Sequence, residues 1–229
     1  MRAQPRIAID GAAGTGKSTI GERLARRLGS LYVDTGAFYR TLTYAALARG
    51  IDSDDGAALG ALAREIHIAM LPPTVSDGRQ YTVLVDGADV TPDLRTPAVE
   101  AHVSRVAIHR VVRAELRERQ REVAGNQSVV MVGRDIGTVV LPDADLKIHL
   151  VTSLEERARR RHGDLVAKYG AASPTLEQVR QEIAERDAFD APNMEVAPDA
   201  VEIDNTHLEA DEVVERIVSL LRERQAGCA

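Results

Sequence analysis

The sequence has 229 residues, of which 44% are hydrophobic and 28% are charged. These proportions are typical of a folded globular protein, and they exclude a disordered or collagen-like chain. A formal net charge of −6 and an aromatic content of 3% argue against a protein that coats nucleic acid. The chain has no run of about 18 apolar residues, so we expect no transmembrane helix and no membrane partner.

The N-terminal residues and the cysteine content bear on the compartment. Residues 1–6 lead directly into an apolar strand pattern, without the apolar core of a secretory signal peptide. The one cysteine, Cys228, cannot form an intramolecular disulfide or a cysteine-based zinc site. We therefore expect a cytoplasmic protein.

Five short apolar runs alternate with helical patterns, as in an α/β protein with a parallel sheet. The predicted strands are residues 6–10, 31–33, 129–132, 146–151 and 200–203. The predicted helices are residues 17–28, 38–49, 97–123, a helix that begins after Ser153 in a capping-box pattern with Glu156, and residues 208–221.

The segment from about residue 64 to residue 96 has a different pattern. Short β-like runs lie at residues 66–68, at residues 81–85 and at Val90, and two Asp-Gly turn signals separate them. The pattern predicts a small antiparallel β insert.

Residues 11–18 read GAAGTGKS and match the phosphate-loop pattern G-x-x-x-x-G-K-[ST] at every fixed position. The motif follows a predicted strand and opens a predicted helix, whose N-terminus adds positive partial charge. Lys17 is placed to reach the β- and γ-phosphates of ATP, and the Ser18 hydroxyl to ligate Mg²⁺. The predicted ATP-binding residues are Gly11, Ala12, Ala13, Gly14, Thr15, Gly16, Lys17, Ser18 and Thr19.

Phosphate loops serve GTPases, motor ATPases and small-molecule kinases alike. The N-K-x-D and D-x-x-G motifs of a GTPase are absent from the sequence. The strand at residues 129–132 leads into Gly133-Arg134-Asp135 rather than into the acidic pair of a motor. The remaining class is a kinase for a small phosphoryl acceptor.

Two candidate acceptor-binding segments follow strands, at the edge of the sheet where ligands of α/β proteins gather. Arg40 comes after the second strand and offers a forked donor for an anion, although a surface salt bridge is an equal alternative. Arg134 and Asp135 come directly after the third strand, where a purely structural pair is less expected.

These segments resemble bacterial cytidylate kinases, a family of P-loop nucleoside monophosphate kinases that phosphorylate CMP and dCMP. The resemblance covers essentially the whole chain. The matching segments are IAIDGAAGTGKS at 7–18, DTGAFYR at 34–40, VSRVA at 103–107, VGRDIGTVVLPDA at 132–144, EERARRR at 155–161 and ERDAFD at 185–190.

The resemblance implies a P-loop kinase fold, with a five-stranded parallel sheet flanked by helices, a small antiparallel β insert and a mobile helical lid. It implies a single domain over residues 1–229. Within that domain, a monophosphate-binding subdomain is expected at about 37–110, with the β insert at about 64–96, and the lid at about 155–195. The fold is competent as a monomer, so we expect one.

The resemblance also implies the acceptor contacts. Arg40 and Arg134 are expected to hold the CMP phosphate, and Arg186 and Asp190 to meet the ribose. Asp135 is suited to accept from the cytosine amine, whereas uracil presents a carbonyl there. The residues expected around cytosine are Thr35, Ser104, Arg113 and Asp135. Taken alone, such a serine or arginine is more often an ordinary surface residue, and only the match to the family favours a binding role for Ser104 and Arg113.

The arginine-rich run at 157–161 begins the expected lid, although such a run is often a solvated helix face. Arg157 and Arg161 are four residues apart and share a helix face, so we expect these two to act in catalysis with Lys17 and Arg134. Asn193 stands where the family commonly has a further lid arginine, which removes one positive charge.

The expected reaction is in-line phosphoryl transfer from MgATP to CMP, without a general base. Two alternatives stay open. The acceptor could be that of a UMP/CMP, adenylate or shikimate kinase. In the other alternative, the chain is a nucleotide-binding regulatory protein that has lost turnover, which only Asn193 supports.

Overall fold

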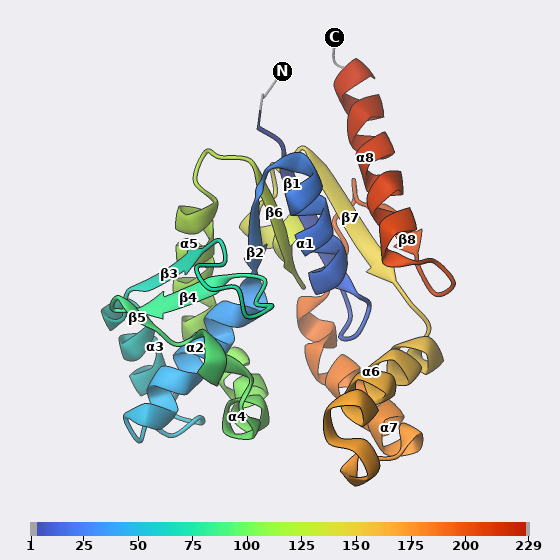
Figure 1. Ribbon diagram of the computed structural model, residues 1–229. Helices are drawn as coiled ribbons and strands as arrows, with labels where there is room; N and C mark the ends of the chain where they lie inside the picture. The colour runs from blue at the N-terminus through green and yellow to red at the C-terminus, as the bar shows by residue number, and fades with distance from the viewer. Residues whose placement is uncertain (1–3, 228–229) are drawn as a thin grey trace. The chain divides into compact units, whose positions relative to one another are not determined.

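The computed structural model describes residues 4–227 (Figure 1), and Cys228 lies outside them. The chain divides into two compact units. Unit 1 comprises residues 4–30 and 130–227 of the described chain, and unit 2 comprises residues 31–129. Each unit is described by itself.

A five-stranded sheet has the strand order β2-β6-β1-β7-β8, which confirms the predicted α/β fold class. Its strands are β1 (Arg6–Gly11), β2 (Leu31–Asp34), β6 (Val129–Gly133), β7 (Leu146–Val151) and β8 (Val201–Asp204). In unit 1, β7 pairs in parallel with both β1 and β8, with Ile148 opposite Ile9 and Val201. All five lie within a residue or two of the ranges predicted from the apolar runs.

Helices α1 (Lys17–Leu28) and α8 (Ala210–Gly227) pack against each other in unit 1 (Figure 1). Their inward faces are fully apolar. The buried side chains on these faces are Ile20, Leu24, Ala25, Val213, Val214, Ile217, Val218 and Leu221. Burial of this apolar stripe supplies most of the free energy that holds a helix to its neighbours. Helix α1 has the predicted bounds, and Gly29 ends it in a left-handed conformation with φ of 64°.

Helices α6 (Leu154–Tyr169) and α7 (Leu176–Asp190) form a second helix pair in unit 1 (Figure 1). Ala158, Val179 and Ile183 form their small shared core. The Ser153 hydroxyl accepts from the Glu156 N–H as predicted. The sequence pattern did not locate α7, because so few of its side chains are buried. A capping box between Thr175 and Gln178 marks its start.

Unit 2 contains four helices and a three-stranded antiparallel sheet, which confirms the predicted β insert. The helices are α2 (Thr35–Ala48), α3 (Gly56–Glu65), α4 (Pro97–Ala107) and α5 (Arg110–Ala124). The strands are β3 (Ile68–Leu71), β4 (Thr82–Val85) and β5 (Ala88–Asp89). Within residues 4–227, the short helical turns are η1 (Thr91–Arg95), η2 (Ile136–Val140), η3 (Gly170–Ala172) and η4 (Ala191–Asn193).

Two helix predictions in unit 2 need correction, and one helix of the unit was not predicted. Helix α2 begins at Thr35, not at Phe38, because the Asp34 carboxylate caps it by accepting from the Gly36 N–H. Helix α3 was missed entirely. The predicted helix at 97–123 is two helices, because His109 adopts an extended conformation and its ring contacts the Ser53 carbonyl at 2.8 Å.

In the described part of the chain, no helix is both long enough and apolar enough to cross a membrane.

Two glycines inside helices predict opposite stability effects for the same substitution. A Cβ at Gly60 of α3 would lie 2.6 Å from Val111 Cγ2, whereas one at Gly163 of α6 meets nothing within 4 Å. Gly163→Ala should raise the free energy of unfolding by about 0.5–1 kcal/mol. Gly60→Ala should lower it by about 1–3 kcal/mol, because the packed helices must separate.

Chemical denaturation of both variants checks these values. Adding Val111→Ala to Gly60→Ala should recover most of the loss, since the obstructing methyl groups are gone. A Gly60→Ala protein as stable as Gly163→Ala would contradict the close α3–α5 packing.

Candidate functional site

The phosphate loop, residues 11–18, connects β1 to α1 as predicted. Gly14 and Gly16 have φ values of 77° and 84°, a conformation that other residues rarely adopt. Gly16 occupies the N-cap position of α1 and, as a glycine, has no side chain that could cap the first turn. The N–H groups of that turn therefore suit an anionic ligand such as a phosphate.

Four carbonyl groups of the loop accept hydrogen bonds from side chains. Lys17 Nζ donates to the Ala12 carbonyl at 2.5 Å, so the ammonium group lies over the loop. The other three carbonyls and their donors are Gly11 with Arg134, Ala13 with Arg157 and Thr15 with Asn205. These donors all belong to unit 1, and they restrain the carbonyl groups of the loop.

Asn205 braces the loop from the segment after β8. Its side-chain nitrogen donates to the Thr15 carbonyl at 2.9 Å, and its side-chain oxygen accepts from the Thr152 hydroxyl. The side chain is 1% exposed. Sequence reasoning missed Asn205. The available signal was an amide side chain directly after a buried strand.

Arg157 lies at the start of α6 and is buried against the loop. It donates to the carbonyls of Ala13 and Thr152 at 3.0 and 3.1 Å, and it forms a two-pronged ion pair with Asp187 of α7 at 2.7 and 3.0 Å. Arg157 therefore joins the phosphate loop to both helices of the pair α6–α7.

The neighbouring arginines of α6 differ in their contacts. Arg160 donates to the carbonyls of Asn205 and Thr206 at 2.9 and 3.3 Å. Glu156 accepts from Arg159 and Arg160, and the hydrogen bond from Arg159 is the main cause that lowers the pKa of Glu156 to about 2. Arg161 is exposed, and its predicted role in catalysis stays a prediction.

Arg134 lies at the end of β6, as predicted. It donates to the Gly11 carbonyl at 2.6 Å and pairs with Asp190 at 2.7 Å. Arg186 lies 3.9 Å from the same Asp190 carboxylate. Burial lowers the pKa of Arg134 from its usual value, although the guanidinium stays charged near neutral pH. Unit 1 thus brings three predicted acceptor residues together.

Asp10 at the end of β1 was not singled out from the sequence. Its carboxylate accepts from the N–H groups of Ile136 and Gly137, each at 2.8 Å. Burial raises the pKa of Asp10 and the nearby Asp135 adds to the rise, while the two N–H groups and Lys17 oppose it. Asp135 itself is buried.

Arg40 lies in a cluster of charged side chains in unit 2 that also contains Asp34, Arg95 and Glu100. Its Nε donates to Glu100 at 3.1 Å, and its Nη1 lies 3.7 Å from Asp34. Burial alone would lower the pKa of Arg40, but Asp34 and Glu100 outweigh it and raise the pKa. Among the described residues, Nη1 is buried without a hydrogen-bond partner. Arg95, which the sequence did not indicate, lies 3.7 Å from Asp34.

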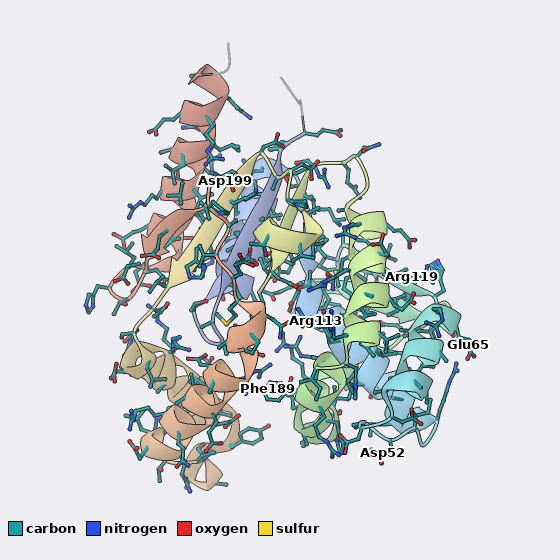
Figure 2. All side chains as sticks on the ribbon, turned by 180° about the vertical axis from the view of Figure 1, so that it is seen from behind. Asp52, Glu65, Arg113, Arg119, Phe189 and Asp199 are labelled. Carbon is teal, nitrogen blue, oxygen red and sulfur yellow. The ribbon has the colours of Figure 1, made fainter. Side chains whose placement is uncertain are left out.

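The predicted cytosine residues of unit 2 come from three helices that pack together. Thr35 is the buried first residue of α2, and Ser104 is half-buried on α4. Arg113 projects from α5, where it lies over the Tyr39 ring at 5.7 Å from the centroid and donates to the Ala107 carbonyl at 3.4 Å (Figure 2).

Comparison with known proteins gives matches along nearly the whole chain. A family model described as cytidylate kinase matches residues 7–223. Three relatives named cytidylate kinase are 48%, 51% and 50% identical to this chain, from Roseiflexus castenholzii, Chloroflexus aggregans and Geobacillus kaustophilus. The alignments cover 98%, 96% and 98% of this chain, and 96%, 94% and 99% of the relatives.

Asn205→Ala should weaken nucleotide binding. The substitution leaves the buried Thr15 carbonyl without its donor, which costs about 1–3 kcal/mol. If a similar amount is lost from the free energy of MgATP binding, the dissociation constant for MgATP rises about tenfold. Titration calorimetry with MgATP measures the effect. Asn126→Ala, an exposed amide of unit 2, is the matched control. Unchanged MgATP affinity in Asn205→Ala would show that the brace serves the fold alone.

Proposed function

This chain belongs to the cytidylate kinase family, and on that premise we propose that it transfers the γ-phosphoryl group of MgATP to CMP or dCMP, giving CDP or dCDP and ADP. The observation that carries the proposal is the family match over residues 7–223. The intact phosphate loop supports it, as do the half-buried Arg40 of α2 and Arg134 at the end of β6.

The donor half of the reaction is proposed for unit 1. The backbone N–H groups at the start of α1, which follow the N-cap glycine, and the glycines of the loop suit the β- and γ-phosphates of ATP. The Lys17 ammonium group donates to the Ala12 carbonyl of the loop, and we assign it to the β- and γ-phosphates of ATP. Lys17, together with Arg134, Arg157 and Arg161, would neutralise charge on the transferring group.

The residues present also fit a magnesium ion that arrives with the nucleotide. Ser18 follows Lys17 in the first turn of α1 and offers one hydroxyl oxygen, the hard ligand that Mg²⁺ prefers. Within residues 4–227, no group of three or more His, Cys, Asp or Glu side chains suits a metal. A bound Mg²⁺ would supply charge neutralisation to the phosphates.

The acceptor phosphate is proposed to bind Arg40 and Arg134. The unpartnered Nη1 of Arg40 supports this, because a buried guanidinium N–H without an acceptor fits an anionic ligand. The pairing of Arg134 with Asp190 keeps that arginine charged and in place until the phosphate arrives.

Recognition of cytosine is proposed for Asp135, Arg113, Ser104 and Thr35. A carboxylate accepts from the cytosine amine, while arginine and serine donate to its ring acceptors. The ribose is assigned to Arg186 and Asp190, whose close approach in unit 1 is consistent with a shared hydroxyl ligand. The assignment of residues from both units to one acceptor rests on the family resemblance.

We also propose that residues of about 155–195 act as a lid and residues of about 37–110 as the monophosphate-binding subdomain, within one kinase domain over residues 1–229. Closure of the lid would exclude water and limit hydrolysis of ATP. No general base is required, because the CMP phosphate is itself a competent nucleophile near neutral pH. A monomeric state, a cytoplasmic location and the lack of a nucleic-acid partner stay predictions.

Acceptor specificity tests the proposed function directly. Steady-state ADP formation is measured with MgATP and a panel of CMP, dCMP, UMP, AMP, dTMP and shikimate. CMP and dCMP should be phosphorylated at least about tenfold faster than the others, since each mispaired polar group in a buried site costs about 1–3 kcal/mol.

A different preferred acceptor would contradict the cytosine assignment and leave the phosphate-loop assignment intact. If MgATP binds but no acceptor turns over, the non-catalytic alternative gains. Asn193→Arg, which restores the family's usual lid charge, is then the variant that tests whether Asn193 is the cause.

Asp135→Asn should reduce discrimination between CMP and UMP. The amide offers an N–H to the uracil carbonyl that the carboxylate repels, so the ratio of kcat/KM values should fall about tenfold or more. Asp143→Asn, which changes an exposed carboxylate paired with Arg6, is the control and should keep the parent ratio. An unchanged ratio in Asp135→Asn would remove Asp135 from the base site.

A further inference from the structure

We propose that Asp10 is a positioning residue, whose carboxylate holds the segment 134–137 against the start of the phosphate loop and so sets where Arg134 and Asp135 meet the acceptor. This inference deepens the proposed function and rests on it. All the contacts that carry it lie within unit 1.

Three hydrogen bonds join the two segments in both directions. Asp10 accepts from the N–H groups of Ile136 and Gly137 at 2.8 Å each, and Arg134 donates back to the Gly11 carbonyl at 2.6 Å. We call this set the Asp10–Arg134 clasp. Because Asp135 lies between the bonded positions, the clasp restrains both its backbone and the side chain of Arg134.

The clasp requires a carboxylate at position 10. The Ile136 N–H donates to Asp10 Oδ1 and the Gly137 N–H donates to Asp10 Oδ2, and an amide at this position offers only one of these two oxygens. An asparagine there would place its own N–H groups against one of the backbone donors. Asp10 is 8% exposed, so a donor left without an acceptor cannot turn to water instead.

The space around the clasp is filled on the side of Gly137. A Cβ at this position would lie 3.3 Å from Asp10 Oδ2 and 3.2 Å from Cδ of the buried Lys147 side chain. A side chain at position 137 would therefore press on Asp10 and Lys147, which would have to shift by a few tenths of an ångström. Small displacements matter here. When a group that aligns the reactants is displaced by about 1 Å, the reaction rate can fall about a hundredfold.

The same kind of contact at the other end of β1 supplies a matched control. Asp145 Oδ2 accepts from the Arg6 N–H at 2.8 Å, at the end of the strand remote from the phosphate loop. Asp145→Asn changes a carboxylate to an amide next to the same strand, where one acceptor oxygen is enough for the single Arg6 N–H, and Asp145 belongs to neither the donor nor the acceptor site proposed above.

The test compares Asp10→Asn with Asp145→Asn in CMP phosphorylation. We expect the KM for CMP to rise about tenfold and the preference for CMP over UMP to fall several-fold in Asp10→Asn only, with the KM for MgATP within about twofold of the parent. A loss of folded protein lowers kcat but moves neither a KM nor a preference, so these two readouts separate positioning from stability.

Two outcomes overturn the inference. In the first, both variants keep the parent KM for CMP and the parent preference, and Asp10 is then only structural. In the second, Asp10→Asn raises the Mg²⁺ concentration needed for half-maximal activity and leaves the acceptor constants unchanged, so that Asp10 acts on the metal.

Gly137→Ala keeps the inference testable if Asp10→Asn does not fold. Its added methyl group presses on the Asp10 carboxylate from the side of Gly137 and retains the charge at position 10, so the KM for CMP should rise and the KM for MgATP should not. Unchanged acceptor constants in Gly137→Ala would count against the positioning role. A parent protein without CMP turnover contradicts the proposed function, whereas a parent with turnover and unaffected variants contradicts this inference alone.

Discussion

The structure of unit 1 depends on how the carbonyl groups of the phosphate loop are held. A loop that presents its N–H groups to an anion must turn its carbonyls away, and each buried carbonyl then needs a donor. Gly11, Ala12, Ala13 and Thr15 receive theirs from Arg134, Lys17, Arg157 and Asn205. These donors come from α1, from the segment after β6, from α6 and from the segment after β8, so the loop is held by four separate parts of the chain.

Buried and half-buried arginines in both units are paired with carboxylates. In unit 1 Arg157 pairs with Asp187 and Arg134 with Asp190, and in unit 2 Arg40 contacts Glu100. A buried guanidinium without an opposite charge would be costly, so these carboxylates keep the arginines in place before a phosphate binds. When a phosphate binds, it can take the place of the carboxylate as the acceptor for the guanidinium N–H groups.

The sequence indicated the sheet well and the helices unevenly. Strands of a parallel sheet are buried on both faces, so each appears as a short apolar run that can be recognised alone. Helix α7 has only Val179 and Ile183 buried, and α3 lies in a stretch rich in alanine and glycine, so neither has a strong apolar period. The break between α4 and α5 depends on His109 reaching Ser53, a contact between residues 56 positions apart.

The sequence by itself determined the phosphate loop, the cytidylate kinase resemblance and the buried strands, because each is written in consecutive or regularly spaced residues. The positions of Arg134 and Asp135 at the end of β6, and of Arg40 in the segment after β2, also followed from the order of the elements. Only the tertiary structure decided which side chains hold those groups. Asp10 and Asn205 contact residues more than 100 positions away, and such contacts exist only once the sheet has brought its strands together.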